Sequence, residues 1–498
     1  MIDILFVGSE KKYSNLIFPR NVNVRFNWES DKLYDVTILS KTLSWGEAYD
    51  LHKHIKAYTL YALSYVEMNE ATDWLIKARK GKTITKEDLQ LFLDNKVQLY
   101  YPNPYGEKFR LNDIHISQNF NGKVNWYGQT YLELNGIFGN DFNQTIFWRN
   151  NIPIFKFQSI EFWLEYEKSD NVEIMMEIVQ MRKGTVSEIQ KKWCFSEIEM
   201  SDMVYIENKD IDSNLFISIF AKGEGTLKIK GLHDRYSRKG EGMFLPGGVR
   251  KITSKREEVF FYYDPGMMKP PLNIYFSGYK TLEGFEGYNM MRSLGSPFLL
   301  ISESRLEGGA FYIGDDEYNS LIISEINRVL RELNFKNSDV IFSGLSMGSY
   351  GALLYSCYFK PYAVVVGKPL INIGNIAKNG RLKRPGVFST SLDVLYKNYG
   401  NLDDRSIESL NDYFWNIFIH TDWSNTKLII SYMIEDDYDS TAYKDILEHC
   451  SNYGIMIIGK GLHGRHNDNT GGIVSWFYKQ LENIMLNEFN QEDNHNGN

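Results

Sequence analysis

A possible nucleophile lies in the segment Gly344-Leu345-Ser346-Met347-Gly348, which has the pattern G-x-S-x-G. The segment follows an apolar, β-branched run and precedes a stretch rich in small residues, which is the setting of a strand-to-helix turn that exposes a serine. The two glycines allow such a turn to close without Cβ clashes. The expected chemistry is attack by the Ser346 hydroxyl on an acyl group, with the Met347 N–H at a helix N-terminus stabilising the oxyanion. The non-catalytic alternative is a tight turn in an α/β domain.

A serine nucleophile of this kind needs a histidine that follows the last strand, after a carboxylate at the end of an earlier one. The nine histidines can be compared with that order. Seven are poorly placed, because they precede the serine or the acid strand, lie in a predicted helix or belong to the polar tail: His52, His54, His115, His233, His420, His449 and His495. His466 and His463 remain, and we take His466 as the base with His463 as the alternate. Either could instead bond a loop carbonyl.

The acid is expected directly after the apolar run at 428–434, where the chain reads Glu435-Asp436-Asp437-Tyr438-Asp439. Counting from the strand end favours Asp436, with Glu435 as the alternate. Asp437 and Asp439 are interpreted as solvated carboxylates near the start of the next helix. Asp436 would hold the imidazole in one tautomer while the histidine deprotonates Ser346.

The oxyanion site needs a second backbone N–H from the loop after an early strand. Ser277-Gly278-Tyr279 ends such a strand, so the amides of Gly278 and Tyr279 are the candidates. The donors are backbone groups, and the sequence therefore indicates only their location.

The elements that must position these residues alternate regularly between strand and helix over residues 257–489. Uncharged, β-rich runs separated by helices indicate a parallel sheet covered on both faces, here an α/β-hydrolase fold. The expected strands are 272–279, 298–304, 340–344, 363–367, 428–434 and 455–459, and the expected helices are 315–335, 347–359, 441–450 and 471–485. Residues 386–426 have no partner strand and are placed as a lid or insertion.

Two further domains are expected ahead of this one. Residues 1–106 have strand-like runs at 4–8, 34–40 and 97–101 between helical stretches, which indicates a small α/β unit. Residues 109–232 alternate apolar and polar positions, which is typical of an antiparallel β-sandwich. Exposed aromatic residues on the sandwich could contact carbohydrate, although filling of its core is the simpler interpretation: Trp126, Tyr127, Tyr131, Trp148, Trp163 and Trp193. Residues 233–256 are predicted to be a basic, glycine-rich linker, and residues 490–498 a disordered tail.

Composition limits the classes of function. The 498 residues carry 55 Lys+Arg against 63 Asp+Glu, a net charge of −8, which argues against a nucleic-acid partner. Cys194, Cys357 and Cys450 form no disulfide framework or metal-binding pattern, so we expect a reducing compartment and no metal. The apolar run at 4–8 is too short for a secretory signal, and no run is long enough to span a bilayer. These features predict a cytoplasmic protein whose membrane association, if any, is peripheral.

The segments YFSGY (275–279), GLSMGSYGALLY (344–355), EDDYD (435–439) and GRHND (464–468), with the domains ahead of them, resemble one family across nearly the whole chain. This is the second of the accessory Sec-system proteins, which serve the export of serine-rich repeat adhesins in Gram-positive bacteria. The resemblance implies O-acetylation of N-acetylglucosamine on the glycosylated adhesin. It implies assembly with two sibling accessory proteins, an accessory motor ATPase and a channel. It maps the triad onto Ser346, Asp436 (glutamate in some members) and His466.

The acetyl donor is not readable from the sequence, because no nucleotide-type glycine pattern precedes a suitable helix. We expect no tightly bound cofactor, and acetyl-CoA is a candidate donor. The alternatives to an acetyltransferase are a carbohydrate esterase with the same triad and a non-catalytic export chaperone or scaffold.

Overall fold

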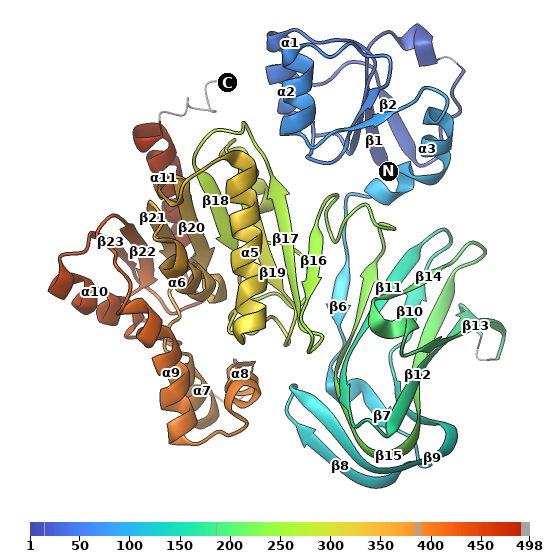
Figure 1. Cartoon of the computed structure of the whole chain (residues 1–498), viewed down its shortest axis with the longest axis vertical. Coiled ribbons are helices and arrows are strands. Elements are labelled where there is room, and N and C mark those ends of the chain that lie inside the picture. Colours follow the sequence, from blue (N-terminus) through green and yellow to red (C-terminus); the bar gives the residue numbers. More distant parts are fainter. Residues whose placement is uncertain (14, 186, 384–387, 389, 490–498) are drawn as a thin grey trace.

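The computed structural model describes residues 1–13, 15–185, 187–383, 388 and 390–489, and it contains three sheets in chain order (Figure 1). The expected tail at 490–498, including His495, lies outside the described residues. Each sheet has its own apolar core. In the part of the chain that is described, no helix has the length and apolarity to cross a membrane.

The first sheet is parallel, with strand order β2-β1-β3-β4-β5. Its strands are β1 Ile2–Val7, β2 Val22–Arg25, β3 Val36–Leu39, β4 Leu60–Leu63 and β5 Lys82–Ile84, and its helices are α1 Trp45–His52, α2 Glu70–Ala78 and α3 Leu89–Asn95. The strand predicted at 97–101 is wrong, because Val97–Tyr100 is a 3-10 helix with Val97 and Tyr100 buried in the core. A short apolar run does not distinguish a strand from a buried helical turn.

The second sheet is antiparallel and is built around two long strands, β9 and β15. Its strands are β6 Gly106–Lys108, β7 Ile114–Ile116, β8 Asn121–Tyr127, β9 Tyr131–Trp148, β10 Ile152–Ile154, β11 Ser159–Lys168, β12 Val172–Arg182, β13 Ile189–Ser196, β14 Val204–Glu207 and β15 Ser213–Tyr236. Gly223 and Gly225 adopt positive φ angles of 97° and 145°, at a point where larger side chains would be strained. On one side of this point β15 pairs with β12, and on the other with β11. The two halves of β15 thus join separate antiparallel layers around one core.

The aromatic residues of this domain divide between core and surface. Trp148 is buried in the core of the sandwich, as the simpler interpretation predicts, whereas Trp163 is buried outside that core against the guanidinium groups of Arg250 and Arg256. Trp126 is 43% exposed, and Tyr127 and Tyr131 lie at the edge facing the third domain, where their rings approach Tyr396. The sandwich therefore presents a small aromatic surface toward the third domain.

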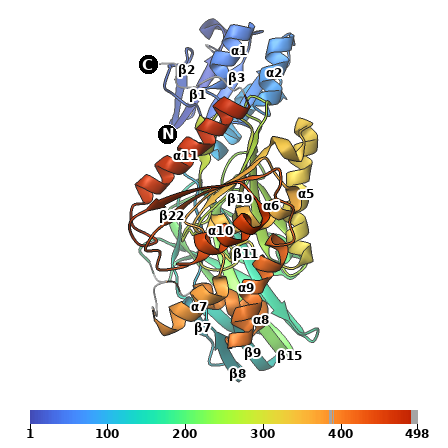
Figure 2. The same cartoon turned by 90° about the vertical axis from the view of Figure 1, so that its left-hand side faces the viewer.

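The third sheet has the order β16-β17-β19-β18-β20-β21-β22-β23 and is parallel from β19 to β23. Its strands are β16 Val249–Ile252, β17 Glu258–Asp264, β18 Leu272–Phe276, β19 Phe298–Glu303, β20 Val340–Leu345, β21 Ala363–Gly367, β22 Lys427–Met433 and β23 Ile457–Leu462. Its helices are α4 Tyr288–Ser293, α5 Asp316–Leu333, α6 Met347–Phe359, α7 Ile373–Leu382, α8 Thr390–Tyr399, α9 Asp404–Phe418, α10 Ala442–Tyr453 and α11 Thr470–Glu488. Apolar side chains of α5 and α6 pack on one face and those of α4 and α11 on the other, so α5 and α11 lie on opposite sides of the sheet (Figure 2).

The predicted linker at 233–256 is not a solvated loop. Its first residues complete β15, and residues 249–252 form an edge strand of the third sheet. The Arg235 side chain is fully buried and donates to both carboxylate oxygens of Glu258 (2.7 and 2.6 Å) and to Glu283 (2.5 Å). Arg238 is also buried and donates to the carbonyls of Leu99 and Tyr101 in the first domain. The carboxylates that pair with Arg235 and the first-domain carbonyls that accept from Arg238 lie elsewhere in the sequence, so local composition could not indicate the burial of these arginines.

Loss of the Arg235 charge is expected to destabilise the contact between the sandwich and the third domain. Burial alone would raise the pKa of Glu258, but Arg235 and Arg250 lower it, so the carboxylate is ionised inside the protein. Arg235→Met would leave Glu258 and Glu283 buried beside a neutral side chain. The free energy of unfolding should fall by about 3–5 kcal/mol in urea denaturation. Arg25→Met is the control, because Arg25 and Glu29 form an exposed pair worth at most about 1 kcal/mol; equal losses in the two variants would contradict this account.

Candidate active site

The G-x-S-x-G segment forms a strained turn between β20 and α6. Ser346 has φ 53° and ψ −120°, an unusual backbone for a residue with a side chain. A Cβ at Gly344 would lie 2.2 Å from the Gly348 carbonyl oxygen, and one at Gly348 would lie 2.1 Å from the Phe276 oxygen. Only glycine fits at both positions, as expected for a nucleophile elbow. The Ser346 N–H donates to the Gly367 oxygen (2.8 Å), which anchors the turn to the neighbouring strand.

Three side chains from separate loops meet at the carboxyl edge of the sheet. His466 Nε2 lies 2.9 Å from Ser346 Oγ, and His466 Nδ1 lies 2.8 Å from Asp436 Oδ2. His466 is 1% exposed and Asp436 8%, whereas Ser346 is half-buried and accessible. These distances fit a neutral imidazole that donates from Nδ1 to the carboxylate and accepts from the serine hydroxyl.

The second carboxylate oxygen of Asp436 accepts hydrogen bonds from the backbone N–H groups of Tyr438 (2.8 Å) and Asp439 (3.2 Å). Burial by itself would raise the pKa of Asp436, but the hydrogen bond and charge of His466, together with these amides, lower it. The His466 ring stacks on Tyr438 at 4.4 Å, and its backbone N–H donates to Asp437 Oδ1. The loop after β22 therefore holds His466 by the edge of its ring, by the face of its ring and by its backbone N–H.

The two alternates pair with each other rather than with the serine. His463 Nδ1 lies 2.9 Å from Glu435 Oε1, and Glu435 also accepts from the Gly464 N–H. The side chains of His463 and Glu435 are 84% and 52% exposed, as is usual for a surface ion pair. The structure thus brings together Ser346, Asp436 and His466, and leaves the alternates outside the constellation.

Asp439 differs from its predicted role as a solvated helix cap. It is 7% exposed and accepts from the N–H groups of Ile371 and Asn372 and from the Asn372 side chain. Burial raises its pKa, which these hydrogen bonds partly offset. Its partners lie about 70 residues earlier in the chain, in the loop after β21, so Asp439 ties the two loops together. Asp437, the other predicted cap, bonds the His466 backbone instead.

The candidate oxyanion donors have different environments. Met347 begins α6 directly after the serine, as predicted. The Gly278 N–H, in contrast, donates to Glu286 Oε2 at 2.6 Å, so in this state it faces a carboxylate rather than an open site. The ring of Tyr279 is 40% exposed and lies beside Phe388. The Gly278 amide is therefore engaged by Glu286, and the Met347 and Tyr279 amides stay predictions for the oxyanion hole.

Two charged residues near the triad were missed. Lys368 follows β21 at the same sheet edge, is 6% exposed and lies 3.4 Å from Thr470 Oγ1. Burial lowers its pKa, while the negative charges of Asp436 and Glu286 raise it. The sequence signal that could have identified Lys368 is its position directly after a buried strand. Glu286, on the loop before α4, had no sequence pattern that could place it beside Gly278.

The predicted lid at 386–426 contains helices α8 and α9. Its residues 386, 387 and 389 lie outside the described residues. Its Phe388 stacks on Tyr438 at 5.5 Å, and Tyr438 in turn covers His466. On the other side, Asp393 accepts from the Gln129 N–H (2.9 Å), and Tyr396 stacks on Tyr127. Helix α8 therefore bridges the sandwich and the triad.

Asp393 gives this bridge a measurable pH dependence. Burial raises the pKa of Asp393 to about 6. The folded state thus binds this proton more tightly than the unfolded chain, and stability falls as pH rises from about 4 to about 6. Asp393→Asn, which keeps the acceptor oxygen, should raise the free energy of unfolding by about 1–3 kcal/mol near pH 7.5 and change it little near pH 4.

Urea denaturation of Asp393→Asn at both pH values checks this expectation. The exposed Asp31→Asn variant is the control and should show no such difference. A destabilised Asp393→Asn protein near pH 7.5, or an equal effect at both pH values, would contradict it.

The parallel sheet, the strained serine turn and the Ser-His-Asp geometry define a protein of the α/β-hydrolase fold with a serine triad. A family model described as the accessory Sec system GspB-transporter matches residues 7–491. The second accessory Sec system protein of Streptococcus gordonii is 37% identical over 443 residues, covering 89% of this chain and 87% of that protein. Its counterpart from Staphylococcus aureus is 36% identical over 446 residues, covering 89% and 81%. The chain belongs to this family, that of the second accessory Sec system protein.

A solved structure shows the same architecture along the whole length. The Glycosylation Associate Protein (Gap123) complex from Streptococcus agalactiae contains a chain that is 33% identical, with a TM-score of 0.86, covering 99% of both chains. The predicted resemblance to the second accessory Sec-system protein is therefore confirmed, and so is the predicted mixed α/β fold with its hydrolase-like domain.

Proposed function

We propose that this protein is an O-acetyltransferase that modifies N-acetylglucosamine on a serine-rich repeat adhesin. The observation that carries the proposal is the hydrogen-bonded chain from Ser346 Oγ through His466 to Asp436. The family supports the choice of substrate, since its members serve accessory Sec export and one relative is part of the Glycosylation Associate Protein (Gap123) complex.

In the first half-reaction, Ser346 Oγ attacks the acetyl carbonyl while His466 Nε2 takes the hydroxyl proton. The tetrahedral intermediate collapses, the leaving group of the donor receives that proton, and the acetyl group remains on the serine as an ester. In the second half-reaction, a sugar hydroxyl gives its proton to His466 and attacks the ester. The proton returns to Ser346 Oγ as the acetylated sugar departs. Asp436 keeps the imidazole in the required tautomer and stabilises the imidazolium.

Transfer rather than hydrolysis requires that water be kept from the acyl-enzyme. Phe388 and Tyr438 cover the imidazole, and helix α8 connects this cover to the sandwich. We infer that the insertion and the sandwich shield the ester while the glycan is bound. Acetyl-CoA is the proposed donor.

The proposal includes an assembly at the inner face of the membrane. The related Gap123 structure is a complex of glycosylation-associated proteins, which supports association of this chain with two sibling accessory proteins. The accessory motor ATPase, the channel and the glycosylated adhesin are the further proposed partners, and membrane contact would be peripheral.

The product of the purified protein distinguishes the candidate functions. The protein is incubated with p-nitrophenyl acetate and a glycopeptide bearing N-acetylglucosamine, and mass spectrometry locates the acetyl group. The proposal predicts an additional acetyl on the sugar. A second incubation uses a glycopeptide whose sugar is already acetylated. Release of free acetate without transfer, together with loss of the acetyl group from this second glycopeptide, would identify a carbohydrate esterase. No change in either glycopeptide would favour a chaperone or scaffold.

A further inference from the structure

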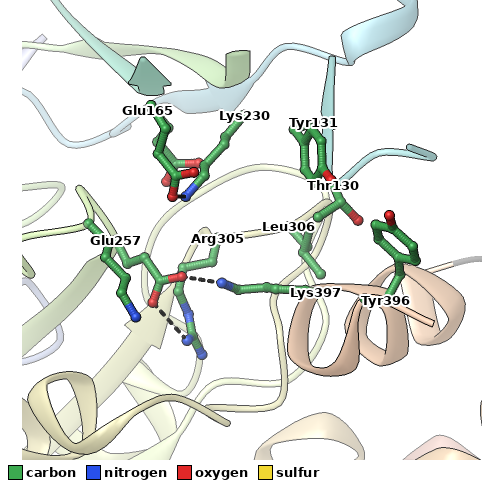
Figure 3. Close-up of a pocket in the computed structure, with 12 residues that line it drawn as sticks. Thr130, Tyr131, Glu165, Lys230, Glu257, Arg305, Leu306, Tyr396 and Lys397 are labelled. Atoms are coloured by element: carbon green, nitrogen blue, oxygen red, sulfur yellow. Dashed lines mark hydrogen bonds and ion pairs between the residues drawn. The ribbon is translucent and has the colours of Figure 1, made fainter. Parts of the chain in front are cut away.

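A cavity of about 310 Å³ lies where the sandwich, the catalytic domain and helix α8 meet. The sandwich contributes Tyr131 and Lys230, and α8 contributes Tyr396 and Lys397. The loops of the catalytic domain contribute Glu257, Arg305 and Leu306, and the side chains from all three parts converge on one space (Figure 3). None of the three triad residues lines this cavity.

The charges around the cavity are already matched. Lys397 pairs with Glu257, which also lies 3.6 Å from Arg305 (Figure 3). Two other lysines of the lining also have partners: Lys230 pairs with Glu167 at 2.5 Å, and Lys255 pairs with Asp315 at 2.6 Å.

An anionic ligand would have to displace an existing carboxylate from one of these cations, and an apolar ligand would bury ion pairs without replacing their hydration. A neutral ligand with many hydroxyl groups satisfies such a lining, because it can donate to the carboxylates and accept from the cations at once.

Aromatic rings form one side of the cavity. Tyr131 and Tyr396 line it, and Tyr127 supports both, stacking on Tyr396 at 5.4 Å and lying 4.6 Å from Tyr131. Tyrosine offers an apolar face together with a polar tip, which suits a ligand with both C–H and hydroxyl surfaces. Sugar rings have this combination.

A short loop runs from the lining of the cavity to the side chain of the residue that follows Ser346. Arg305 and Leu306 line the cavity, while a Cβ placed on Gly309 would lie 2.6 Å from the Met347 side chain. Four residue steps span at most about 14 Å, so the cavity lies within a few sugar units of the residue that follows Ser346. The same loop is held to α8, because Thr390 Oγ1 donates to the Glu307 carbonyl.

We propose that this cavity is a saccharide-binding subsite that holds a neutral sugar of the acceptor glycan while a neighbouring sugar is at Ser346. The inference rests on the proposed function for the identity of the acceptor. The binding of sugar in the cavity does not require Ser346, so sugar binding and acetyl transfer can be tested separately.

The test measures binding of N-acetylglucosamine and its β-linked oligosaccharides by isothermal titration calorimetry. The intact protein and Ser346→Ala should bind equally. Tyr396→Ala should weaken binding about tenfold through loss of the stacking face. Lys230→Met, which changes the sandwich side of the cavity, should also weaken sugar binding. It takes the place of Tyr396→Ala in the test if that variant is unstable. Tyr358→Ala, an exposed tyrosine on α6, is the matched control.

Activity measurements separate this inference from the proposed function. Tyr396→Ala should raise the KM for the glycan about tenfold with a smaller effect on kcat, whereas the control Tyr358→Ala should leave both, and the hydrolysis of p-nitrophenyl acetate, within about twofold. No binding by the intact protein, or equal binding by the intact protein, Tyr396→Ala and Lys230→Met, would overturn the subsite. Normal sugar binding with no transfer would overturn the proposed function and leave the subsite in place.

Discussion

Replacing Ser346 with alanine is expected to lower kcat for acetyl release from p-nitrophenyl acetate by about 10⁶-fold. The hydroxyl oxygen is the only atom of this side chain that can form the acyl ester, and it lies 2.9 Å from the imidazole that would accept its proton. The variant should also lose the initial burst that reports accumulation of an acyl-enzyme. Stopped-flow and steady-state kinetics measure both quantities.

The control for this variant is Ser356→Ala, on helix α6, which begins directly after Ser346. Ser356 is buried and donates to the Leu353 carbonyl, outside the triad, so its loss should leave kcat within about twofold. Thermal unfolding of both variants shows whether the fold is kept. Retention of the burst and of kcat in folded Ser346→Ala would contradict a serine nucleophile.

Asp436→Asn is expected to lower kcat about 10⁴-fold, because an amide in this position can hold the imidazole in the wrong tautomer. The adjacent Glu435→Gln variant should stay within about threefold, since Glu435 pairs with the exposed His463. The two variants each remove one charge from neighbouring positions, so either is a control for the other. The reverse ranking would contradict the assignment of Asp436 as the acid of the triad.

The sequence was sufficient to predict the parallel sheet of the third domain and the strained turn that carries Ser346. Buried parallel strands are recognisable as uncharged β-rich runs, and the elbow needs glycines at fixed offsets from the serine, which is why Gly344 and Gly348 identified it. The acid could be narrowed only to Asp436 or its neighbour Glu435, and the base only to His466 or His463. Glu435 and Asp436 leave the same strand in succession, and only the path of the loop decides which carboxylate turns toward His466.

The features that could not be predicted depend on partners far away in the sequence. Arg235 is buried because Glu258 and Glu283 reach it from the third domain. Tyr127 meets Tyr396 across about 270 residues, and neither sequence neighbourhood indicates the contact. A local pattern records the period and polarity of one segment, whereas these contacts arise from the packing of three domains.

We propose that acetyl groups reach the glycan through Ser346. Mass spectrometry of the glycan on the co-expressed adhesin, with the intact protein compared with Ser346→Ala, is the decisive measurement for this transfer. A hexosamine-linked acetyl group should be present with the intact protein and lost with the variant. An acetyl content that is the same in both, or higher with the variant, would contradict it.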